Sequence, residues 1–402
     1  MRYRWLDYLR GLAALWMIEV HVVDVALDPH WHTSQWFPWL SLTHGFVAVA
    51  FLFCAGGALA ITLERKLDAY RRFERPLWDY LAKLGLLLLI GYWLHLPAFS
   101  LERTLHATPQ ELVRLADCDI LQTIAYSSLI ALAIALFIPR PNWYRSTYAA
   151  ISITIAILTP LVWEHRFDEN LPLFIGALIA PQPVSKFPLF PFAAYFFAGA
   201  WIVLWLQNRP RRVIWLVTLA CLGIAAVTMV IGFSSPKQWW HSSPIHTLFR
   251  LSATVAALCM LMLTHETITR QRFSNILLLA GQQSLWVYVF HLLLVYGSVG
   301  GNGLSAVIGK QLNPFETVML IIAISVVTLG TAWMWAYLKH VMPQVVRVVV
   351  AAVVVTAGAT FVLLPARYAA LLSTGELVRR DGVVPAVVQS DLPRSPAVPV
   401  QE

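Results

Sequence analysis

Apolar runs of about twenty residues recur from one end of this chain to the other. As a helix, each run can cross about 30 Å of hydrocarbon, and a helix satisfies its own backbone hydrogen bonds in lipid. Only 12% of the 402 residues are charged and 58% are hydrophobic, whereas a soluble domain carries about 25% charged residues. We therefore expect an all-α fold, a polytopic transmembrane helical bundle of about eleven helices, or about ten if the last run does not cross. The expected spans are 5–27, 44–64, 77–97, 117–138, 143–163, 187–207, 212–233, 246–266, 275–298, 315–338 and 343–365.

Lys and Arg gather in alternate loops, and this bias predicts the orientation of the helices. The loops on the side of the N-terminus hold about sixteen of them, and the opposite loops hold about six. We therefore expect a cytoplasmic N-terminus. One membrane-embedded domain is expected over residues 1–366. A disordered tail is expected over 367–402, because that segment is rich in Pro, Val and polar residues without periodicity.

The net charge of +8 does not indicate nucleic acid as a partner, because the basic residues lie in short loops between apolar runs. The partner that the composition does indicate is the lipid bilayer. The cysteines are scattered and have no C-x-x-C spacing, so neither a disulfide framework nor a zinc site is predicted. They are Cys54, Cys118, Cys221 and Cys259.

The first expected helix carries polar residues that a membrane span usually lacks. Arg10 and His21 are nearly eclipsed around the axis and about 16 Å apart along it, whereas Glu19 points the opposite way. One interpretation is structural: Arg10 extends to the cytoplasmic surface and pairs with Asp7. The other is a functional stripe that runs from the inner to the outer interface. The residues within roughly 100° of the circumference are Asp7, Arg10, His21, Asp24 and Asp28.

The loop that follows, residues 27–39, has no Lys or Arg but contains two histidines and three tryptophans. An interfacial aromatic belt would explain Trp31 and Trp36. A cleft for a sugar or an acyl group would also explain them, with His32 as a base or nucleophile. No carboxylate or cysteine cluster accompanies the histidines, so no metal site is predicted.

Two later runs repeat polar residues at helical spacing. In the fourth, Gln122 and Tyr126 follow Asp119 on one face. In the ninth, Ser284, Tyr288 and His291 do the same. Such faces either form hydrogen bonds between helices or line a cavity for substrate. The small residues 55–58 are expected to allow close helix packing.

Several short motifs, taken in order, carry a resemblance to a known superfamily. The opening Leu6-Asp7-Tyr8-Leu9-Arg10-Gly11 with His21 resembles the start of transmembrane acyltransferases, and the spacing from Arg10 to His21 is similar to the R-x10-H signature of the acyltransferase-3 family. Later motifs are similar to bacterial relatives of heparan-α-glucosaminide N-acetyltransferase. These are Asp119-Ile120-Leu121-Gln122-Thr123, Phe187-Pro188-Leu189-Phe190-Pro191-Phe192, Thr247-Leu248-Phe249-Arg250 and Gly281-Gln282-Gln283-Ser284-Leu285 with Tyr288 and His291.

The resemblance implies an enzyme, an acyltransferase in a bacterial inner membrane. It would move an acyl group, acetyl in such enzymes, from cytoplasmic acyl-CoA to a hydroxyl or amine of a sugar or glycan on the outer side. In the heparan-acetylating enzymes an active histidine follows the first helix, and His32 stands at the matching place. The family's Asn-Gly after that histidine is absent here, so the choice between His32 and His21 stays open.

The remaining roles follow from charge and position. Asp24 or Asp28 would orient the catalytic imidazole. Arg10, with Asp7, would guard the entry of the anionic CoA, and Arg72 and Arg75 would contact its phosphates. The residues expected to contact the acceptor or acyl group are Trp31, Trp36, Gln122, Tyr126, Ser284, Tyr288 and His291.

A transporter or flippase is the alternative, because intramembrane charge and a large number of helices suit it equally well. Such proteins often contain helices broken by Pro or Gly in two corresponding halves. That pattern is not evident here. The acyltransferase interpretation is therefore favoured.

Overall fold

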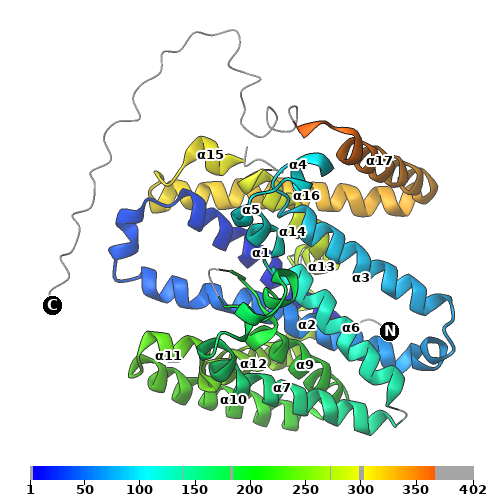
Figure 1. The fold of residues 1–402 in the computed structure, drawn as a ribbon. Helices are drawn as coiled ribbons and strands as arrows, with labels where there is room; N and C mark the ends of the chain where they lie inside the picture. The colour runs from blue at the N-terminus through cyan, green and yellow to red at the C-terminus, as the bar shows by residue number, and fades with distance from the viewer. Residues whose placement is uncertain (1–2, 139, 182–183, 272, 298–302, 367–402) are drawn as a thin grey trace.

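The computed structural model describes residues 3–366 except 139, 182–183, 272 and 298–302. The predicted tail over 367–402 lies outside the described residues. Within them the fold is all-α, as predicted, and no strand forms (Figure 1). The elements are α1 (Arg4–Ala26), η1 (Pro29–Thr33), α2 (Phe37–Arg71), α3 (Arg75–Trp93), α4 (Leu101–Leu105), α5 (Pro109–Ala116), α6 (Ile120–Phe137), α7 (Pro141–Glu164), η2 (Phe167–Asn170), α8 (Leu173–Gly176), α9 (Leu189–Leu206), α10 (Arg211–Phe233), α11 (Lys237–Ser242), α12 (Pro244–Thr269), α13 (Ser274–Gln282), α14 (Ser284–Tyr296), α15 (Leu304–Ile308), α16 (Pro314–Val341) and α17 (Pro343–Leu363).

Each expected span coincides with a helix or a helix pair. Eight helices of the described chain are long and apolar enough to cross a membrane, and a bent pair makes up to nine. α1 and α3 occupy the first and third expected spans but carry charged residues along their length. The ninth span is not one continuous helix as predicted: α13 and α14 meet at 83° beside Gln283. The Lys339 ammonium of α16 donates to the Gln283 side chain at 2.7 Å, which holds the polar break in place.

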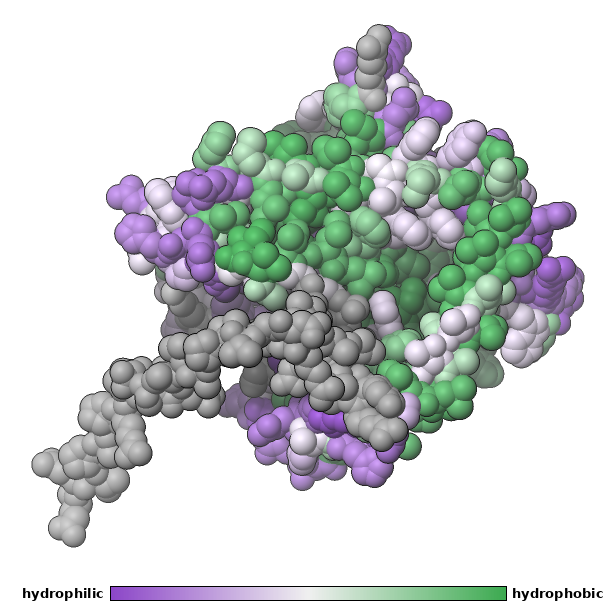
Figure 2. Space-filling view, turned by 90° about the horizontal axis from the view of Figure 1, so that it is seen from above, coloured by the Kyte–Doolittle hydropathy of each residue, from purple (hydrophilic) through white to green (hydrophobic). Residues whose placement is uncertain are grey.

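The helices divide into inner and outer ones. Most of the apolar window of α9 is buried, as it is in α2 and α12, whereas none of the window of α17 is buried. α7, α10 and α16 also expose most of their apolar length. Figure 2 shows a broad apolar face with hydrophilic residues toward its edges. This distribution is that of a bundle whose outer helices face lipid.

Glycines allow two of the inner helix pairs to touch backbone to backbone. A Cβ at Gly56 of α2 would lie 1.9 Å from the Phe196 carbonyl oxygen of α9, and a Cβ at Gly199 would lie 2.1 Å from that of Phe53. The predicted role of the small residues 55–58 is therefore confirmed. α1 and α13 cross in the same way, since a Cβ at Gly11 would lie 2.1 Å from the Leu277 carbonyl oxygen.

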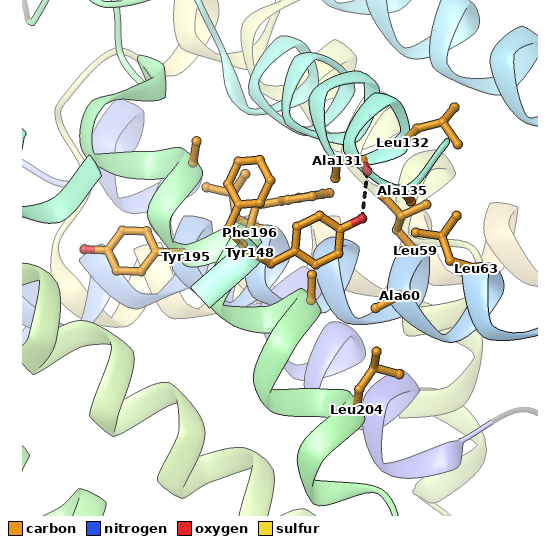
Figure 3. Close-up of a cluster of buried hydrophobic side chains, with 14 of the residues drawn as sticks. Leu59, Ala60, Leu63, Ala131, Leu132, Ala135, Tyr148, Tyr195, Phe196 and Leu204 are labelled. Carbon is orange, nitrogen blue, oxygen red and sulfur yellow. Dashed lines mark hydrogen bonds between the residues drawn. The ribbon is translucent and has the colours of Figure 1, made fainter. Parts of the chain in front are cut away.

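The largest buried cluster joins α2, α6, α7 and α9 (Figure 3). Phe196 and Leu59 pack in it, and the buried Tyr148 hydroxyl donates to the Ala131 carbonyl at 2.7 Å. A hydroxyl that is buried among apolar side chains needs such an acceptor. This cluster also includes Met17 of α1 and Tyr288 of α14, so both helices pack against it.

Candidate active site

Two charged residues lie near the N-terminal end of α1. The Arg10 guanidinium lies 3.8 Å from Asp7 Oδ1, one helical turn away. Asp7 is buried where α1 crosses α13, and a buried carboxylate is stable only with a counter-charge or donors nearby. The structure thus shows the Asp7–Arg10 pair that the sequence left as one of two interpretations.

His21 lies in the second half of α1 and contacts α14 through Tyr296. Its Nδ1 is 2.9 Å from the Tyr296 hydroxyl oxygen. That hydroxyl donates to Asp24 Oδ2 at 3.4 Å. Donation of the single phenol hydrogen to Asp24 makes the Tyr296 oxygen the acceptor for His21 Nδ1–H, and the lone pair then lies on Nε2. Asp24, Tyr296 and His21 form a hydrogen-bonded chain that orients the imidazole.

A second imidazole from α14 faces the first. The rings of His21 and His291 have centroids 5.3 Å apart. His291 Nδ1 lies 2.6 Å from the Val287 carbonyl oxygen, so this nitrogen carries the hydrogen. His291 Nε2 is buried and has no hydrogen-bond partner among the described residues. An acceptor lone pair in this position can receive a hydrogen bond from a substrate.

Tyr288 connects this pair to α6. Its ring lies against that of His291, with centroids 6.0 Å apart, and its hydroxyl donates to Asp119 Oδ2 at 2.8 Å. Asp119 caps α6, because its other oxygen accepts from the Ile120 N–H at 2.7 Å. One carboxylate thus both starts α6 and holds Tyr288 of α14.

Asp117 lies in the loop just before α6, beside His95. His95 Nε2 is 3.7 Å from Asp117 Oδ2, and the Lys186 backbone N–H donates to Asp117 Oδ1 at 3.0 Å. Burial raises the pKa of the Asp117 carboxyl, although the N–H of Lys186 and the His95 ring act in the opposite direction. Titratable groups therefore continue beyond Asp119 into the loop before α6.

The predicted stripe of α1 is interrupted between Arg10 and His21. Ala14 and Ile18 are fully buried and pack with Ala280 and Val287 of α13 and α14. Arg10 and His21 are therefore separated by apolar packing about three turns long.

The η1 loop holds the other predicted histidine. The His32 ring stacks on Phe37, with centroids 4.2 Å apart, and His32 Nε2 is buried without a partner among the described residues. Asp28 caps the loop by accepting from the His30 N–H at 2.8 Å. Trp31 lies beside His30, and Trp36 is exposed just before α2. These residues lie near one another, but among the described residues no hydrogen bond or ring contact joins them to the His21 cluster.

The remaining predicted residues lie in other places. Tyr126 pairs with the Tyr92 hydroxyl of α3 at 2.9 Å, and Gln122 packs against Gly91 of α3. Ser284 is the first residue of α14, at the break. Arg72 and Arg75 are exposed at the turn between α2 and α3, where they pair with Glu74 and Asp79. Of the predicted set, the structure groups His21, Asp24, Tyr288 and His291.

Sequence reasoning missed Tyr296 and the partner of Glu19. Tyr296 is the last residue of α14 and does not share the face of Tyr288 and His291, so periodicity could not identify it. Glu19 Oε1 lies 3.1 Å from His44 Nε2 of α2. Among the described residues no group of three or more His, Cys, Asp or Glu could hold a metal ion.

The fold and the histidine cluster between α1 and α14 define a polytopic membrane protein with acid–base groups among its helices. The family model described as an acyltransferase domain matches residues 3–364, nearly the whole chain. The chain therefore belongs to the acyltransferase-3 family, and it is an integral membrane acyltransferase. No curated protein and no solved structure matches it.

Proposed function

We propose that the protein transfers an acyl group from cytoplasmic acyl-CoA to a hydroxyl or amine on the outer side of the membrane, with His21 as the base. The chain from Asp24 through Tyr296 to His21 is the observation that carries this proposal. It holds an imidazole, oriented through its Nδ1, between α1 and α14, which is the arrangement that general-base catalysis requires. His32, in contrast, stacks on Phe37 in a loop.

In the proposed reaction, His21 Nε2 removes the proton from the acceptor O–H or N–H as its oxygen or nitrogen bonds to the thioester carbonyl carbon. The C–S bond then breaks, and the CoA thiolate takes the proton from the imidazolium. The products are the acylated acceptor and free CoA thiol. Asp24, through Tyr296, stabilises the imidazolium that exists between the two proton transfers.

His291 and Tyr288 complete the proposed site on the other side of the acceptor. His291 Nε2, buried and unpaired in the described residues, accepts a second hydrogen bond from the acceptor. Asp119 fixes Tyr288, and Tyr288 supports the His291 ring. The acceptor is thereby oriented before the proton moves, which reduces the entropic cost of the reaction.

The donor enters from the end that bears Arg10. CoA carries phosphates that cannot cross lipid, so its nucleotide stays beside Arg10 and the basic turn of Arg72 and Arg75. The pantetheine arm then has to pass Ala14 and Ile18. We propose that α14 moves away from α1 at the Gln283 break to admit this arm.

The acetyl group and a sugar acceptor are proposed from the resemblance to bacterial relatives of heparan-α-glucosaminide N-acetyltransferase. Asp24 is exposed near the end of α1, and η1 with the aromatic Trp31 follows directly in the chain. Aromatic faces bind sugars by apolar contact, so an acceptor at this end would have both stacking surfaces and a base within reach.

The test uses purified full-length protein in nanodiscs, radiolabelled acetyl-CoA and a panel of amino sugars and glycan fragments. We expect a labelled product and a stoichiometric amount of free CoA thiol. Folded protein that neither binds nor consumes acyl-CoA, across several chain lengths, would contradict the proposal. Counterflow of a panel sugar in proteoliposomes without product would instead establish a transporter.

A further inference from the structure

A groove of about 250 Å³ lies between α9 and α10. Both helices pack against α12 (Figure 1), which supplies the third wall of the groove. The lining includes Trp201 and Trp205 of α9, Cys221 and Ile224 of α10, and Leu248 of α12. None of the lining residues belongs to the proposed transfer site, so the groove is a feature that the proposed function leaves unused.

The groove is apolar and opens on an exposed face of the bundle. Ser252 and Val255 of α12 are buried at its base, whereas Trp201 and Trp205 are 42% and 40% exposed. The one hydroxyl in the lining, that of Ser252, donates to the Phe249 carbonyl of its own helix at 3.0 Å. Most of the apolar length of α10 is exposed as well. In a membrane this groove therefore opens to hydrocarbon.

The size and lining of the groove suit a segment of a lipid chain. Atoms that line an empty space lose their dispersion contacts on that side, and in a bilayer acyl chains are the molecules that can restore them. The groove is smaller than the roughly 300–1,000 Å³ of a pocket that encloses a drug-sized ligand. Along α10 it extends from Val217 to Ile224, a rise of about 10 Å. It therefore holds part of one chain and not a whole molecule.

A cation lies at the Trp205 end of the groove. The Arg209 Cζ is 4.7 Å from the centre of the Trp205 ring, and Arg209 Nε donates to the Trp205 carbonyl at 3.2 Å. Among the described residues Arg209 makes no ion pair with a carboxylate, and its two Nη groups have no hydrogen-bond partner. Arg212, at the start of α10, is also exposed. The guanidinium is thus fixed over the ring while its Nη donors stay available.

We propose that the groove and Arg209 bind an anionic phospholipid of the bilayer. One acyl chain lies in the groove against Trp201 and Cys221, and the lipid phosphate accepts two hydrogen bonds from the Nη groups of Arg209. Basic residues at the end of a cleft between membrane helices attract anionic headgroups. A zwitterionic lipid brings its own cation toward Arg209 and Arg212, so a headgroup of net negative charge is favoured. The proposal does not depend on the transfer reaction.

The experiment uses purified full-length protein in nanodiscs of phosphatidylcholine with a small share of phosphatidylglycerol that carries a photoreactive diazirine in one acyl chain. After illumination, mass spectrometry of peptides locates the label. We expect the label on residues 217–224 and 248–255. Replacing part of the host lipid with unlabelled phosphatidylglycerol should reduce this label, and replacing it with phosphatidylethanolamine should not. Label spread evenly over α7, α10, α16 and α17 would overturn the groove as a site, and equal competition by phosphatidylethanolamine would overturn the anionic headgroup.

Arg209→Gln tests the headgroup contact. It should raise the share of probe needed for half-maximal label about fivefold, because one arginine near the membrane surface contributes about that factor to the binding of an anionic lipid. Arg140→Gln is the matched control, since Arg140 lies over the Trp143 ring of α7 at 5.4 Å but not beside the groove. It should leave the label in the groove unchanged. An Arg209→Gln variant that behaves like this control would overturn the role of Arg209.

Cys221→Trp tests the chain contact, because the larger side chain fills the groove. The label on residues 217–224 and 248–255 should then be lost. Leu219→Trp is the matched control, since Leu219 of the same helix is 61% exposed and does not line the groove. It should keep the label. Equal label in the two folded variants would overturn the proposal, and the exposed Arg209→Gln decides the question if Cys221→Trp does not fold.

Discussion

Two histidine-bearing regions near the same end of α1 differ in what holds their side chains. In the first, His21 is fixed by Tyr296 of α14, and His291 is fixed by its own helix and by Tyr288, which Asp119 of α6 holds. In the second, the η1 loop, contacts are local: His32 stacks on Phe37, and Asp28 caps the loop. Both regions combine histidine with aspartate and aromatic residues, but the aromatic residues of the first are tyrosines with hydroxyl groups. A catalytic base needs a fixed orientation, and among the described residues a chain of hydrogen-bonded side chains supplies it in the first region alone.

The largest effect should come from His21. We expect His21→Gln to lower the rate of acyl transfer by about 10²- to 10⁴-fold, because it removes the general base. Initial rates with radiolabelled acetyl-CoA measure this effect. His30→Gln, an exposed histidine of η1, is the control and should keep the rate of the unaltered protein. Similar rates for His21→Gln and the control would show that His21 is not the general base.

A smaller loss of activity is expected when the hydrogen bonds from Asp24 through Tyr296 to His21 are removed. Tyr296→Phe removes the hydroxyl between His21 and Asp24, and an unmade hydrogen bond of roughly 1–3 kcal/mol corresponds to a loss of about five- to 150-fold in kcat. Tyr126→Phe is the matched control, since Tyr126 pairs with Tyr92 of α3, and kcat should stay within about twofold. Equal losses of kcat in both variants would mean that the hydroxyl groups support the packing of the helices and do not orient the imidazole.

The loop histidine should matter little to the chemistry. We expect His32→Gln to change kcat by less than about threefold and to act, if at all, on the KM of the acceptor, because His32 contributes packing against Phe37. Steady-state kinetics with varied acceptor separate the two constants. A loss of kcat as large as that of His21→Gln would show instead that the catalytic base is His32 of η1.

The smallest effect concerns the stability that Asp117, in the loop before α6, contributes to the fold. Burial raises the pKa of Asp117 above its ordinary value of 3.8, so the stability it contributes is present below that value and is lost as pH rises through the raised pKa. Asp117→Asn keeps an acceptor for the Lys186 N–H. Its Tm relative to the unaltered protein should therefore rise from about pH 3.5 toward neutrality. Thermal unfolding across this range checks the sign, and a difference that shrinks with pH would contradict it.

The fold was largely predictable because run length determines where a helix can cross a membrane. α1 and α10, for example, begin and end within a residue of the expected 5–27 and 212–233. The break at Gln283 was not predictable from hydropathy. The polar group there is satisfied by Lys339, which is distant in sequence, and only the packed bundle brings the two together.

The site was predictable on α1 but not across it. Periodicity grouped His21 with Asp24 and, separately, Tyr288 with His291. It does not state which helices pair, so it could not bring the two groups together. Tyr296 lies at the end of α14 and off the predicted face. Glu19 pairs with His44 because α2 packs beside α1. Long-range partners of this kind come from packing, which a single sequence does not encode in its local pattern.

The most direct test is to locate the donor carbonyl in the bound protein. A cryo-EM structure of the full chain in nanodiscs, with a thioether analogue of acetyl-CoA, would show the position of the reacting carbon. We predict that this carbon lies between α1 and α14, with room for an acceptor atom about 3–3.5 Å from both the carbon and His21 Nε2, and that the CoA phosphates lie at the Arg10 end. A reacting carbon beside His32 in η1, with α1 and α14 still closed around Ala14 and Ile18, would contradict the account.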